Sequence, residues 1–278
     1  MALQAKINPD KVPGRSSPLS IHKLSVSKNS SDILKDISFE VLPGEILGIV
    51  GANRSGKTTL GSFISGTIDV PKKNISYQHA IFNGEDLENI NPQNRYSKGL
   101  HYSFENHRLF DHMTVRDNLE VVMMHSSSKE RKKRIQDVIE LFPKIENLLN
   151  KKVKQCNVGQ QQIISIARTI MLFPTVLVLD EPTSGLSEEG IKALTQVLDV
   201  LITGSVSVLI LERRASFIDD IADRRLNLID KKLIEPIETS SRAVEWKPEV
   251  IKPIEKTNEF ETPLIDQSNE DDEWRPEL

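Results

Sequence analysis

A glycine-containing loop at residues 51–58 constrains the fold of this chain more than any other feature of its sequence. The loop reads GANRSGKT, which matches GxxxxGK[ST], and it lies between an apolar segment and residues with helical spacing. In such a loop the backbone N–H groups turn inward around phosphates, and the following helix adds its positive N-terminal end. The sequence therefore predicts a nucleotide-binding P-loop domain. The residues assigned to the nucleotide are Gly51, Ala52, Asn53, Arg54, Ser55, Gly56, Lys57, Thr58 and Thr59.

A second motif, TVLVLDE at residues 175–181, is an apolar segment that ends in two acidic residues. Asp180 is expected to hold Mg²⁺ through water, together with the hydroxyl group of Thr58, while Lys57 reaches the β- and γ-phosphates. Glu181 is then placed to polarise the water that attacks the γ-phosphate. The two motifs in this order predict ATP and Mg²⁺ as cofactors.

Hydrophobic periodicity predicts an α/β fold with two kinds of strand. The segments LSIHKLSV (19–26) and DISFEVLP (36–43) alternate apolar and polar residues, as half-buried antiparallel strands do. The segments at 45–51, 175–181 and 205–212 are continuously apolar, which is typical of parallel strands buried on both faces. Helical spacing at 158–172 and 188–201 predicts helices that cover this sheet. The more polar stretch between the P-loop helix and residue 175 is interpreted as mainly helical, with helices at 115–125 and 128–149.

Composition divides the 278 residues into three parts. Residues 1–18 are polar with several prolines and predict a flexible arm, and residues 19–234 form the nucleotide-binding domain, with a helical subdomain at about 105–168. Residues 235–278 are charged, acidic and rich in proline, which predicts a largely disordered tail with short adhesive patches at 244–246 and 260–265.

Charge and hydropathy argue against several classes of protein. The net charge of −4 argues against nucleic acid as a partner. The single cysteine, Cys156, fits a reducing compartment. The longest apolar runs are far shorter than the roughly 20 residues that span a bilayer, and the N-terminus lacks the apolar stretch of a signal peptide. We therefore expect a cytoplasmic protein that reaches the inner face of the membrane only through a partner.

Three stretches together resemble the ATP-binding subunits of ABC transporters: GANRSGKTTL, NVGQQQIISIARTIMLFPTVLVLDEPTSGL and LILERRASFIDDIADR. The similarity covers about residues 19–230. It implies a P-loop NTPase core of the ABC type, with a parallel sheet, a small antiparallel β-subdomain and an α-helical subdomain. It also implies a head-to-tail pair of cassettes that works with a membrane permease. Each ATP then lies between the P-loop of one cassette and the signature loop of the other, here Asn157, Gly159 and Gln160.

A narrower resemblance comes from FENHRLFDHMTVRDNLEV (104–121) and ELFPKI (140–145), which are similar to the ATPase subunits of branched-chain amino acid and urea importers. That resemblance implies a carboxylate at Glu105 where most of the superfamily has glutamine, with a role at the metal and in coupling. The related lipopolysaccharide-export ATPases share much of this pattern and remain an alternative.

Several positions depart from the family pattern, and most of them bear on chemistry. Arg54 replaces a P-loop glycine, where positive φ is free of strain only for glycine. Asn157 and Val158 replace the serine and a glycine of the signature, and Arg213 takes the place of the switch histidine as a candidate catalytic residue. The D-loop carboxylate is Ser187 here. No aromatic residue lies in 23–32 to stack on adenine, so only Lys28 or Leu34 remain as substitutes.

Two hypotheses follow for the function. In the first, the chain binds and hydrolyses ATP, dimerises and drives a permease. In the second, it is a degenerate subunit that binds nucleotide beside an intact cassette and has a structural or regulatory role. A soluble ABC protein of translation or DNA repair fits less well, because such proteins usually carry two cassettes or a long coiled coil. The altered signature, switch and D-loop leave open whether the chain is an active enzyme.

Overall fold

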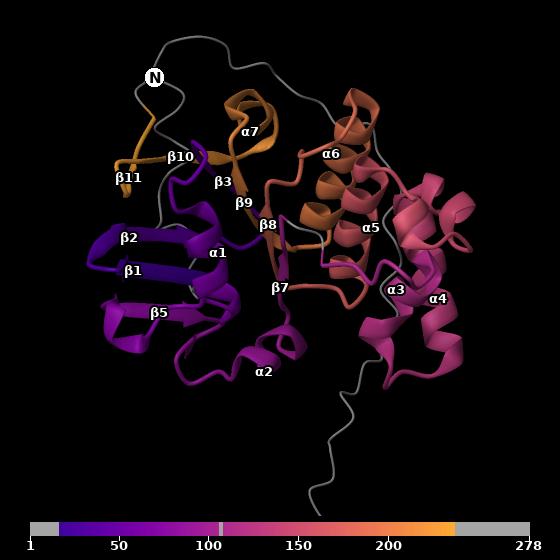
Figure 1. Ribbon diagram of the computed structural model, residues 1–278, viewed down its shortest axis with the longest axis horizontal. Helices are drawn as coiled ribbons and strands as arrows, with labels where there is room; N and C mark the ends of the chain where they lie inside the picture. Colours follow the sequence, from indigo (N-terminus) through magenta and orange to yellow (C-terminus); the bar gives the residue numbers. More distant parts are fainter. Residues whose placement is uncertain (1–16, 106–107, 237–278) are drawn as a thin grey trace, which may run out of the picture. The chain divides into compact units, whose positions relative to one another are not determined.

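A computed structural model describes residues 17–105 and 108–236, which form two β-sheets with helices around the larger one (Figure 1). The expected N-terminal arm and C-terminal tail lie almost wholly outside the described residues, and so do the patches expected at 244–246 and 260–265. Within the described residues, no helix is both long enough and apolar enough to cross a membrane.

The larger sheet has six strands in the order β11-β10-β3-β9-β8-β7. Neighbouring strands are parallel from β10 to β7, and only β11 is antiparallel to its neighbour. The sequence prediction of three apolar strands is confirmed, since every residue of β3, β8 and β9 is buried. The bounds are β3 (Ile46–Gly51), β7 (Leu100–Ser103), β8 (Val176–Asp180), β9 (Ser207–Glu212), β10 (Arg224–Ile229) and β11 (Lys232–Ile234).

The carboxyl ends of the parallel strands meet at one edge of this sheet, and the chemistry-bearing residues gather there. Strand β3 runs into the P-loop, β8 ends at Asp180 and β9 ends at Glu212. The register pairs Val50 with Glu212 and Asp180 with Leu211. Ligands bind outside this edge in α/β folds.

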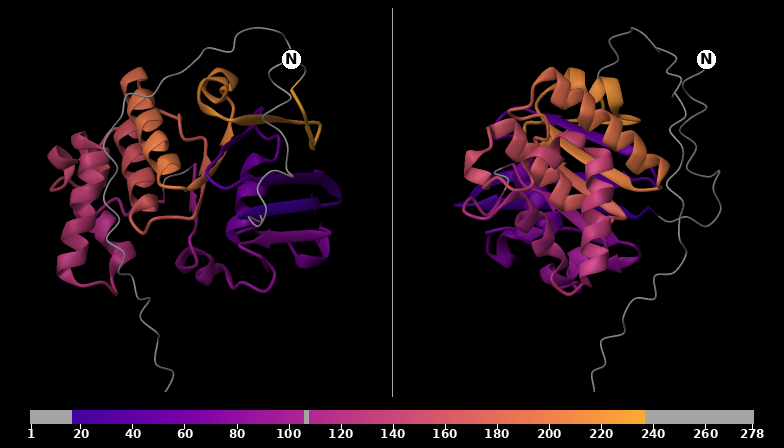
Figure 2. Two further views of the ribbon diagram at one scale, coloured as in Figure 1. Left: turned by 180° about the vertical axis from the view of Figure 1, so that it is seen from behind. Right: turned by 90° about the vertical axis from the view of Figure 1, so that its right-hand side faces the viewer.

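Alternation along the buried strands gives the sheet two separate cores. On one face, Leu47 and Ile49 belong to a core with α1 (Lys57–Ser65) and the smaller sheet. On the other face, Ile46 and Val50 pack with helices α5 (Val158–Ile170), α6 (Glu188–Thr203) and α7 (Ala215–Ile221). Figure 2 shows these helices on one side of the sheet from two further directions.

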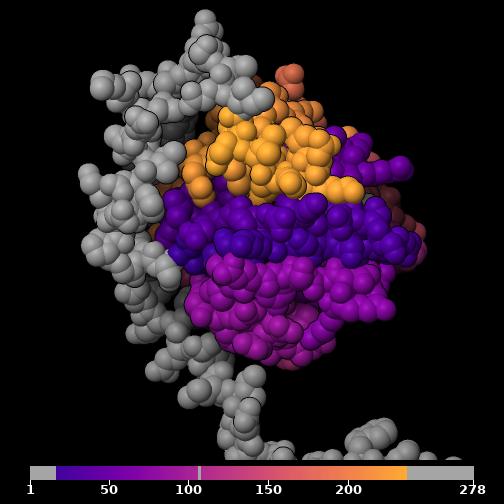
Figure 3. Space-filling view, turned by 90° about the vertical axis from the view of Figure 1, so that its left-hand side faces the viewer, coloured from indigo at the N-terminus to yellow at the C-terminus, as the bar shows by residue number. Residues whose placement is uncertain are grey.

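The smaller sheet is antiparallel, with the order β2-β1-β5-β6 and with β4 paired to β1. The predicted alternation is confirmed in the inward-facing residues of β1, and Asn29 and Ser30 take positive φ in the tight turn that joins β1 to β2. Figure 3 shows β1 and β2 as an indigo band beside the orange end of the larger sheet. The backbone N–H of Lys35 donates there to the carbonyl of Lys231 at 2.8 Å. The bounds are β1 (Leu19–Lys28), β2 (Ser31–Val41), β4 (Ile75–Ser76), β5 (His79–Phe82) and β6 (Glu85–Asp86).

The helices predicted after residue 108 are present but shorter than the sequence suggested. Helix α3 (Val115–Glu120) begins at a Thr114–Asp117 capping box and ends in a 3₁₀ turn. Helix α4 (Ser128–Leu141) ends at Phe142, because a residue before proline avoids the helical conformation and Pro143 follows.

The prediction of a mainly helical stretch between α1 and residue 175 was wrong for residues 75–103. That part of the chain contains β4, β5, β6 and β7, with the short helix α2 (Pro92–Ser97) before β7. These strands have only two to four residues, so the alternation that identifies a strand is too short to be recognised.

Candidate nucleotide-binding site

The P-loop leaves the end of β3 and forms an open cradle before α1. Helix α1 begins after Gly56, whose φ is 111°, and its first turn has no side-chain cap and no acidic residue. Its first N–H groups therefore need an external acceptor, which phosphate oxygens supply. Within residues 17–105 and 108–236, the buried Oγ atom of Ser55 has no hydrogen-bond partner, and a Cβ atom on Gly51 would lie 2.5 Å from it. The loop is thus shaped for an anion and is too tight for a larger residue at Gly51.

The other P-loop residues lie on the accessible side of this cradle. Ala52, Asn53, Arg54 and Thr58 are exposed, and Thr59 is half-buried. Arg54 takes φ of 61°, so this position does adopt the left-handed conformation that the family's glycine suggests. For a residue with a side chain this conformation costs about 1–2 kcal/mol. Leu34 is fully buried and Lys28 is exposed, so of these two only Lys28 has an accessible side chain.

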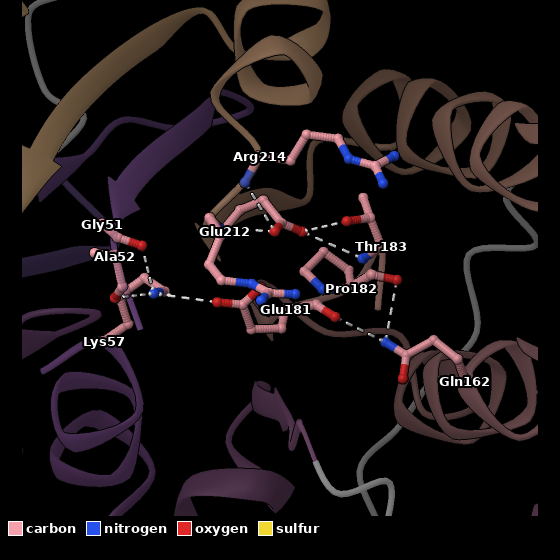
Figure 4. Close-up of polar contacts among 10 residues, drawn as sticks. Gly51, Ala52, Lys57, Gln162, Glu181, Pro182, Thr183, Glu212 and Arg214 are labelled. Carbon is pink, nitrogen blue, oxygen red and sulfur yellow. Dashed lines mark hydrogen bonds and ion pairs between the residues drawn. The ribbon is translucent and has the colours of Figure 1, made fainter. Parts of the chain in front are cut away.

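Lys57 is buried, and its ammonium group has three neighbours in this structure. Nζ donates to the carbonyl oxygens of Gly51 at 2.7 Å and Ala52 at 3.0 Å, and it lies 3.1 Å from Oε1 of Glu181 (Figure 4). An ammonium group has three N–H donors, so all three are engaged. Lys57 must therefore exchange at least one partner to reach a phosphate.

Asp180 ends β8 with one carboxylate oxygen held and the other without a partner. The phenol of Tyr102 donates to Oδ2 at 2.8 Å, while Oδ1 is buried and has no hydrogen-bond partner among the described residues. Burial raises the pKa of Asp180, against the opposing effects of Tyr102, of the nearby Thr58 hydroxyl and of Lys57. A buried oxygen atom without a partner beside a threonine hydroxyl fits a hard cation such as Mg²⁺.

The described residues contain no cluster of three histidine, cysteine, aspartate or glutamate side chains that would form an all-protein metal site. Mg²⁺ does not require one, because it is commonly held by one or two carboxylates together with substrate phosphates and water. Glu105, also assigned to the metal, is exposed in the turn after β7. Its negative charge adds to the burial that raises the pKa of Asp180, so the two carboxylates lie close enough to interact.

Glu181 is the most constrained residue of the site. It is 4% exposed, takes φ of 49° and lies between two cations, with Oε2 at 3.2 Å from Nε of Arg213. Burial and the neighbouring Glu212 raise the pKa of Glu181 to about 7, although Lys57 acts in the opposite direction. Backbone strain of this kind is concentrated at functional sites.

Glu212 is a buried carboxylate next to Glu181 that the sequence reasoning did not single out. It accepts hydrogen bonds from the Thr183 hydroxyl at 2.7 Å and from the backbone N–H groups of Arg213 at 2.7 Å and Arg214 at 3.1 Å. Burial opposes the charged form of Glu212, but hydrogen bonds from Glu181, Thr183 and these amides lower its pKa. Glu212 therefore holds its negative charge more readily than Glu181 does.

Two further residues at this site were also missed. Tyr102 binds Asp180 as described, and the side chain of Gln162 donates to the carbonyl oxygens of Glu181 at 3.4 Å and Pro182 at 3.1 Å. The only sequence signal for Glu212 is an acidic residue that ends the apolar segment 205–212. Tyr102 and Gln162 carry no comparable signal, because their roles depend on which strand and helix pack together.

The signature residues form a separate structure at the start of α5. Asn157 and Gln160 make a reciprocal capping box, with Asn157 Oδ1 at 2.8 Å from the Gln160 backbone N and Gln160 Oε1 at 3.0 Å from the Asn157 backbone N. Gly159 packs closely on Gly185, and the Val158 side chain is 59% exposed. Helix α5 begins at this position, as the asparagine N-cap predicted. The side-chain oxygen of Asn157 accepts from the backbone N–H of Gln160, one of the N–H groups in the first turn that have no partner within the helix.

Four features together define a P-loop nucleotide-binding cassette: the P-loop before the uncapped helix α1, the buried Lys57, the acidic end of β8 and the capped start of α5. The sequence profile of the ABC transporter family matches residues 34–184, and this chain belongs to that family. It is 29% identical over 216 residues to the high-affinity branched-chain amino acid transport ATP-binding protein BraG of Pseudomonas aeruginosa, covering 78% of this chain and 91% of BraG.

Other relatives are longer proteins. The chain is 31% identical over 220 residues to the ribose import ATP-binding protein RbsA of Bacillus subtilis, covering 77% of this chain and 43% of RbsA. It is 36% identical over 186 residues to the spermidine/putrescine import ATP-binding protein PotA of Legionella pneumophila, covering 66% of this chain and 48% of PotA. The chain thus spans less than half the length of these two relatives.

Solved structures share the fold. An ATP-binding cassette of an ABC transporter, MJ1267, superimposes with a TM-score of 0.70 and 21% identity over 79% of this chain and 90% of that one. A dimeric bacterial ABC transporter cassette, MJ0796, gives a TM-score of 0.69 and 19% identity over 77% of this chain and 96% of that one. The predicted α/β core of the ABC type is therefore confirmed.

Proposed function

We propose that this chain binds Mg-ATP at Gly51–Thr58 and couples nucleotide-driven pairing of two cassettes to a membrane permease. The observation that carries the proposal is the 3.1 Å contact between Nζ of Lys57 and Oε1 of Glu181. Lys57 is the first residue of the uncapped helix α1, and Glu181 directly follows β8. When ATP binds, Lys57 would leave Glu181 and contact the phosphates. Thr58 and Asp180 would hold Mg²⁺, which would neutralise the developing charge on the phosphates. The nucleotide-binding domain extends over about residues 19–234.

Hydrolysis is proposed to be slow, because Glu181 is poorly placed to act as a base. With its pKa raised to about 7, part of Glu181 is ionised near neutral pH, and Arg213 pairs with that ionised fraction and so holds it away from water. Asn157 replaces the family's serine and so removes the hydroxyl donor of the signature loop, while its own side-chain oxygen accepts a hydrogen bond from the Gln160 backbone N–H. Loss of one donor to a developing charge commonly costs about 10²–10³ in rate.

The partners follow from the relatives. BraG, RbsA and PotA are named as ATP-binding proteins of transport systems, and two of them as import proteins. By analogy, this chain acts as the peripheral subunit of an importer on the inner face of the cell membrane, beside a permease and a second cassette, with no nucleic acid as partner. The capped signature loop at Asn157, Gly159 and Gln160 faces the ATP of that second cassette.

A second candidate function is that of a degenerate cassette with a structural or regulatory role beside an intact one. The ion pair between Arg213 and Glu181 favours it, because an engaged carboxylate does not activate water. This candidate shares the nucleotide site and differs in turnover.

One experiment tests the shared part of both functions. Binding of a fluorescent ATP analogue in Mg²⁺ should be lost or weakened by at least about tenfold in Lys57→Ala, because one charge-assisted phosphate contact is worth about 1.5–3 kcal/mol. Lys72→Ala is the matched control, since Lys72 is an exposed lysine in an ion pair with Glu88 away from the P-loop. Equal affinity in Lys57→Ala and in the native chain would show that the site assignment is wrong.

Turnover then separates the two functions. The purified chain should hydrolyse ATP very slowly, and the double variant Arg213→His with Asn157→Ser should be faster if those two losses limit the rate. Robust hydrolysis by the native chain that disappears in Glu181→Gln would exclude the degenerate function.

A further inference from the structure

Helix α4 begins with a run of basic side chains that the proposed function does not use. Residues 128–134 read SKERKKR, with five basic residues and one acidic residue. The two arginines of this run serve the fold. Arg131 donates to the carbonyl of Ser126 at 2.6 Å, and the guanidinium group of Arg134 lies 3.7 Å from the centre of the Phe173 ring.

The three lysines of the same run form one exposed face of α4, the lysine face. Lys129, Lys132 and Lys133 are spaced by three and four residues, which places them side by side on a helix. All three are exposed, and none has an ion-pair partner among the described residues. Ile135 and Val138 lie on the opposite side of the helix, buried in the core. Figures 1 and 2 show α4 on the outside of the helical part of the molecule.

The stability of α4 does not explain where these charges lie. The N-terminal end of a helix carries a partial positive charge and favours acidic residues, while basic residues are favoured at the C-terminal end. In α4 this order is reversed, because the lysines lie in the first two turns and the last turn has no basic residue. Glu130, the acidic residue of the first turn, accepts from the backbone N–H of Ser127 at 2.7 Å. The helix end therefore adds to the positive potential of the lysine face.

An apolar side chain lies in the turn that leads into the lysine face. Met124 is 67% exposed and follows the 3₁₀ turn at the end of α3. The bond from Arg131 to the carbonyl of Ser126 holds this turn against the start of α4. Basic residues beside an exposed apolar residue are typical of segments that lie on a membrane surface. There the cations meet the headgroups and the apolar side chain enters the boundary of the acyl chains.

We propose that the lysine face and Met124 together bind the surface of an anionic phospholipid bilayer. The inference goes beyond the proposed function, because this contact requires neither a nucleotide nor a permease. Each lysine close to an anionic membrane surface strengthens binding by about fivefold. A nucleic acid would also attract the lysines, but it has no apolar layer for Met124 to enter.

Co-sedimentation of the full chain with sucrose-loaded vesicles, without nucleotide, tests the proposal. The native chain should bind vesicles of equal parts phosphatidylglycerol and phosphatidylcholine. Binding should weaken as salt is added, because the Debye length falls from about 10 Å at 0.1 M to about 3 Å at 1 M. The triple variant Lys129→Gln, Lys132→Gln and Lys133→Gln should bind at least about tenfold more weakly. Met124→Ser should bind about threefold more weakly, because it loses an apolar side chain from the interface.

The matched control is the triple variant Lys73→Gln, Lys192→Gln and Lys232→Gln, which removes the same charge from exposed lysines on three separate elements. Its partition coefficient should stay within about threefold of the native value, because scattered charges are screened from the membrane. An equal loss in both triple variants would overturn the proposal, since net charge rather than the lysine face would then drive binding. Equal binding of the native chain to vesicles of phosphatidylcholine alone, or no binding to the mixed vesicles, would also overturn it.

Two further results decide the nature of the partner and the role of folding. Tighter binding of the native chain to single-stranded RNA than to mixed vesicles at equal phosphate concentration would overturn the lipid assignment, and so would unchanged vesicle binding in Met124→Ser. If the triple variant of the lysine face does not fold by circular dichroism, Lys133→Gln alone decides. Its expected loss is about fivefold, and an unchanged partition coefficient is the overturning result.

Discussion

The pKa of Glu181 leads to a testable prediction about the stability of the fold. Burial and Glu212 raise this pKa from 4.5 to about 7, so the folded chain keeps a proton that the unfolded chain releases at lower pH. The contribution of such a group to stability is complete below its unfolded pKa and is lost as the pH rises through its folded pKa. Glu181→Gln keeps the shape and the hydrogen-bond donor of the protonated carboxyl but has no proton to release. The free energy of unfolding of this variant, relative to the native chain, should therefore increase with pH.

The magnitude follows from the two pKa values. One pKa unit corresponds to about 1.4 kcal/mol, so a shift from 4.5 to about 7 corresponds to about 3 kcal/mol over the complete titration. Between about pH 5 and about pH 8 the expected gain of Glu181→Gln over the native chain is about 2 kcal/mol, because the unfolded carboxyl is already partly ionised at the lower limit. Glu212 does not interfere. Its pKa is lowered, so its own contribution is lost only at more acidic pH.

Urea unfolding followed by circular dichroism at several pH values between these limits measures the effect. Subtracting the native chain from the variant at each pH removes the titration of all other groups. Glu189→Gln is the matched control, because Glu189 is an exposed glutamate whose pKa is lowered by its ion pair with Lys144. Its difference from the native chain should be independent of pH over the same range.

A difference between Glu181→Gln and the native chain that stays constant, or decreases as the pH rises, would refute the reasoning. It would mean that Lys57 and Arg213, at 3.1 Å and 3.2 Å, outweigh burial and Glu212 and keep Glu181 ionised. The proposed explanation of slow turnover would then have to rest on the ion pair with Arg213 alone.

Two predictions concern residues that support the site. Asn157→Ala should lower the free energy of unfolding by about 1 kcal/mol because the cap of α5 is lost, while Asn157→Ser should lie close to the native chain, and equal losses in both would contradict the capping role. Arg95 is buried and donates to the carbonyls of Phe63, Ile64, Leu87 and Ile90. Arg95→Met should therefore lower the free energy of unfolding by about 3 kcal/mol, as measured by urea unfolding. A loss below about 1 kcal/mol would show that water replaces the guanidinium group at the end of α1.

The sequence predicted the parts of the fold whose signal is local. Strands β3, β8 and β9 were recognisable because both faces of each are buried, which leaves a continuous apolar run. Strand β7 was not recognised from the sequence because it has only four residues. One of them is the polar residue His101, which is buried between the carbonyls of Thr169 and Tyr96. A buried polar residue of this kind is stabilised only by tertiary hydrogen bonds, which a local pattern does not contain.

The residues of the candidate site also fall into two groups, those with a local sequence signal and those whose contacts depend on the tertiary fold. Lys57, Thr58, Asp180 and Glu181 were assigned from spacing, because a loop followed by a helix and an acidic strand end has few other uses. The partners of Glu181 were not predictable, since Lys57 and Arg213 reach it from elements that are more than a hundred and about thirty residues away in the chain. Arg213 was expected near the reaction, but its contact with Glu181 follows from the parallel register that places the end of β9 beside β8.

Arg213 links the binding of a nucleotide to the ionisation of Glu181. A phosphate that draws Lys57 away removes one positive charge from Glu181, and loss of a nearby cation raises the pKa of a carboxyl group further. Arg213 then remains as the cation that pairs with the ionised fraction of Glu181. The same ion pair restrains the carboxylate from accepting a proton from water. The residue at the switch position thus accounts for the slow reaction in the proposed function.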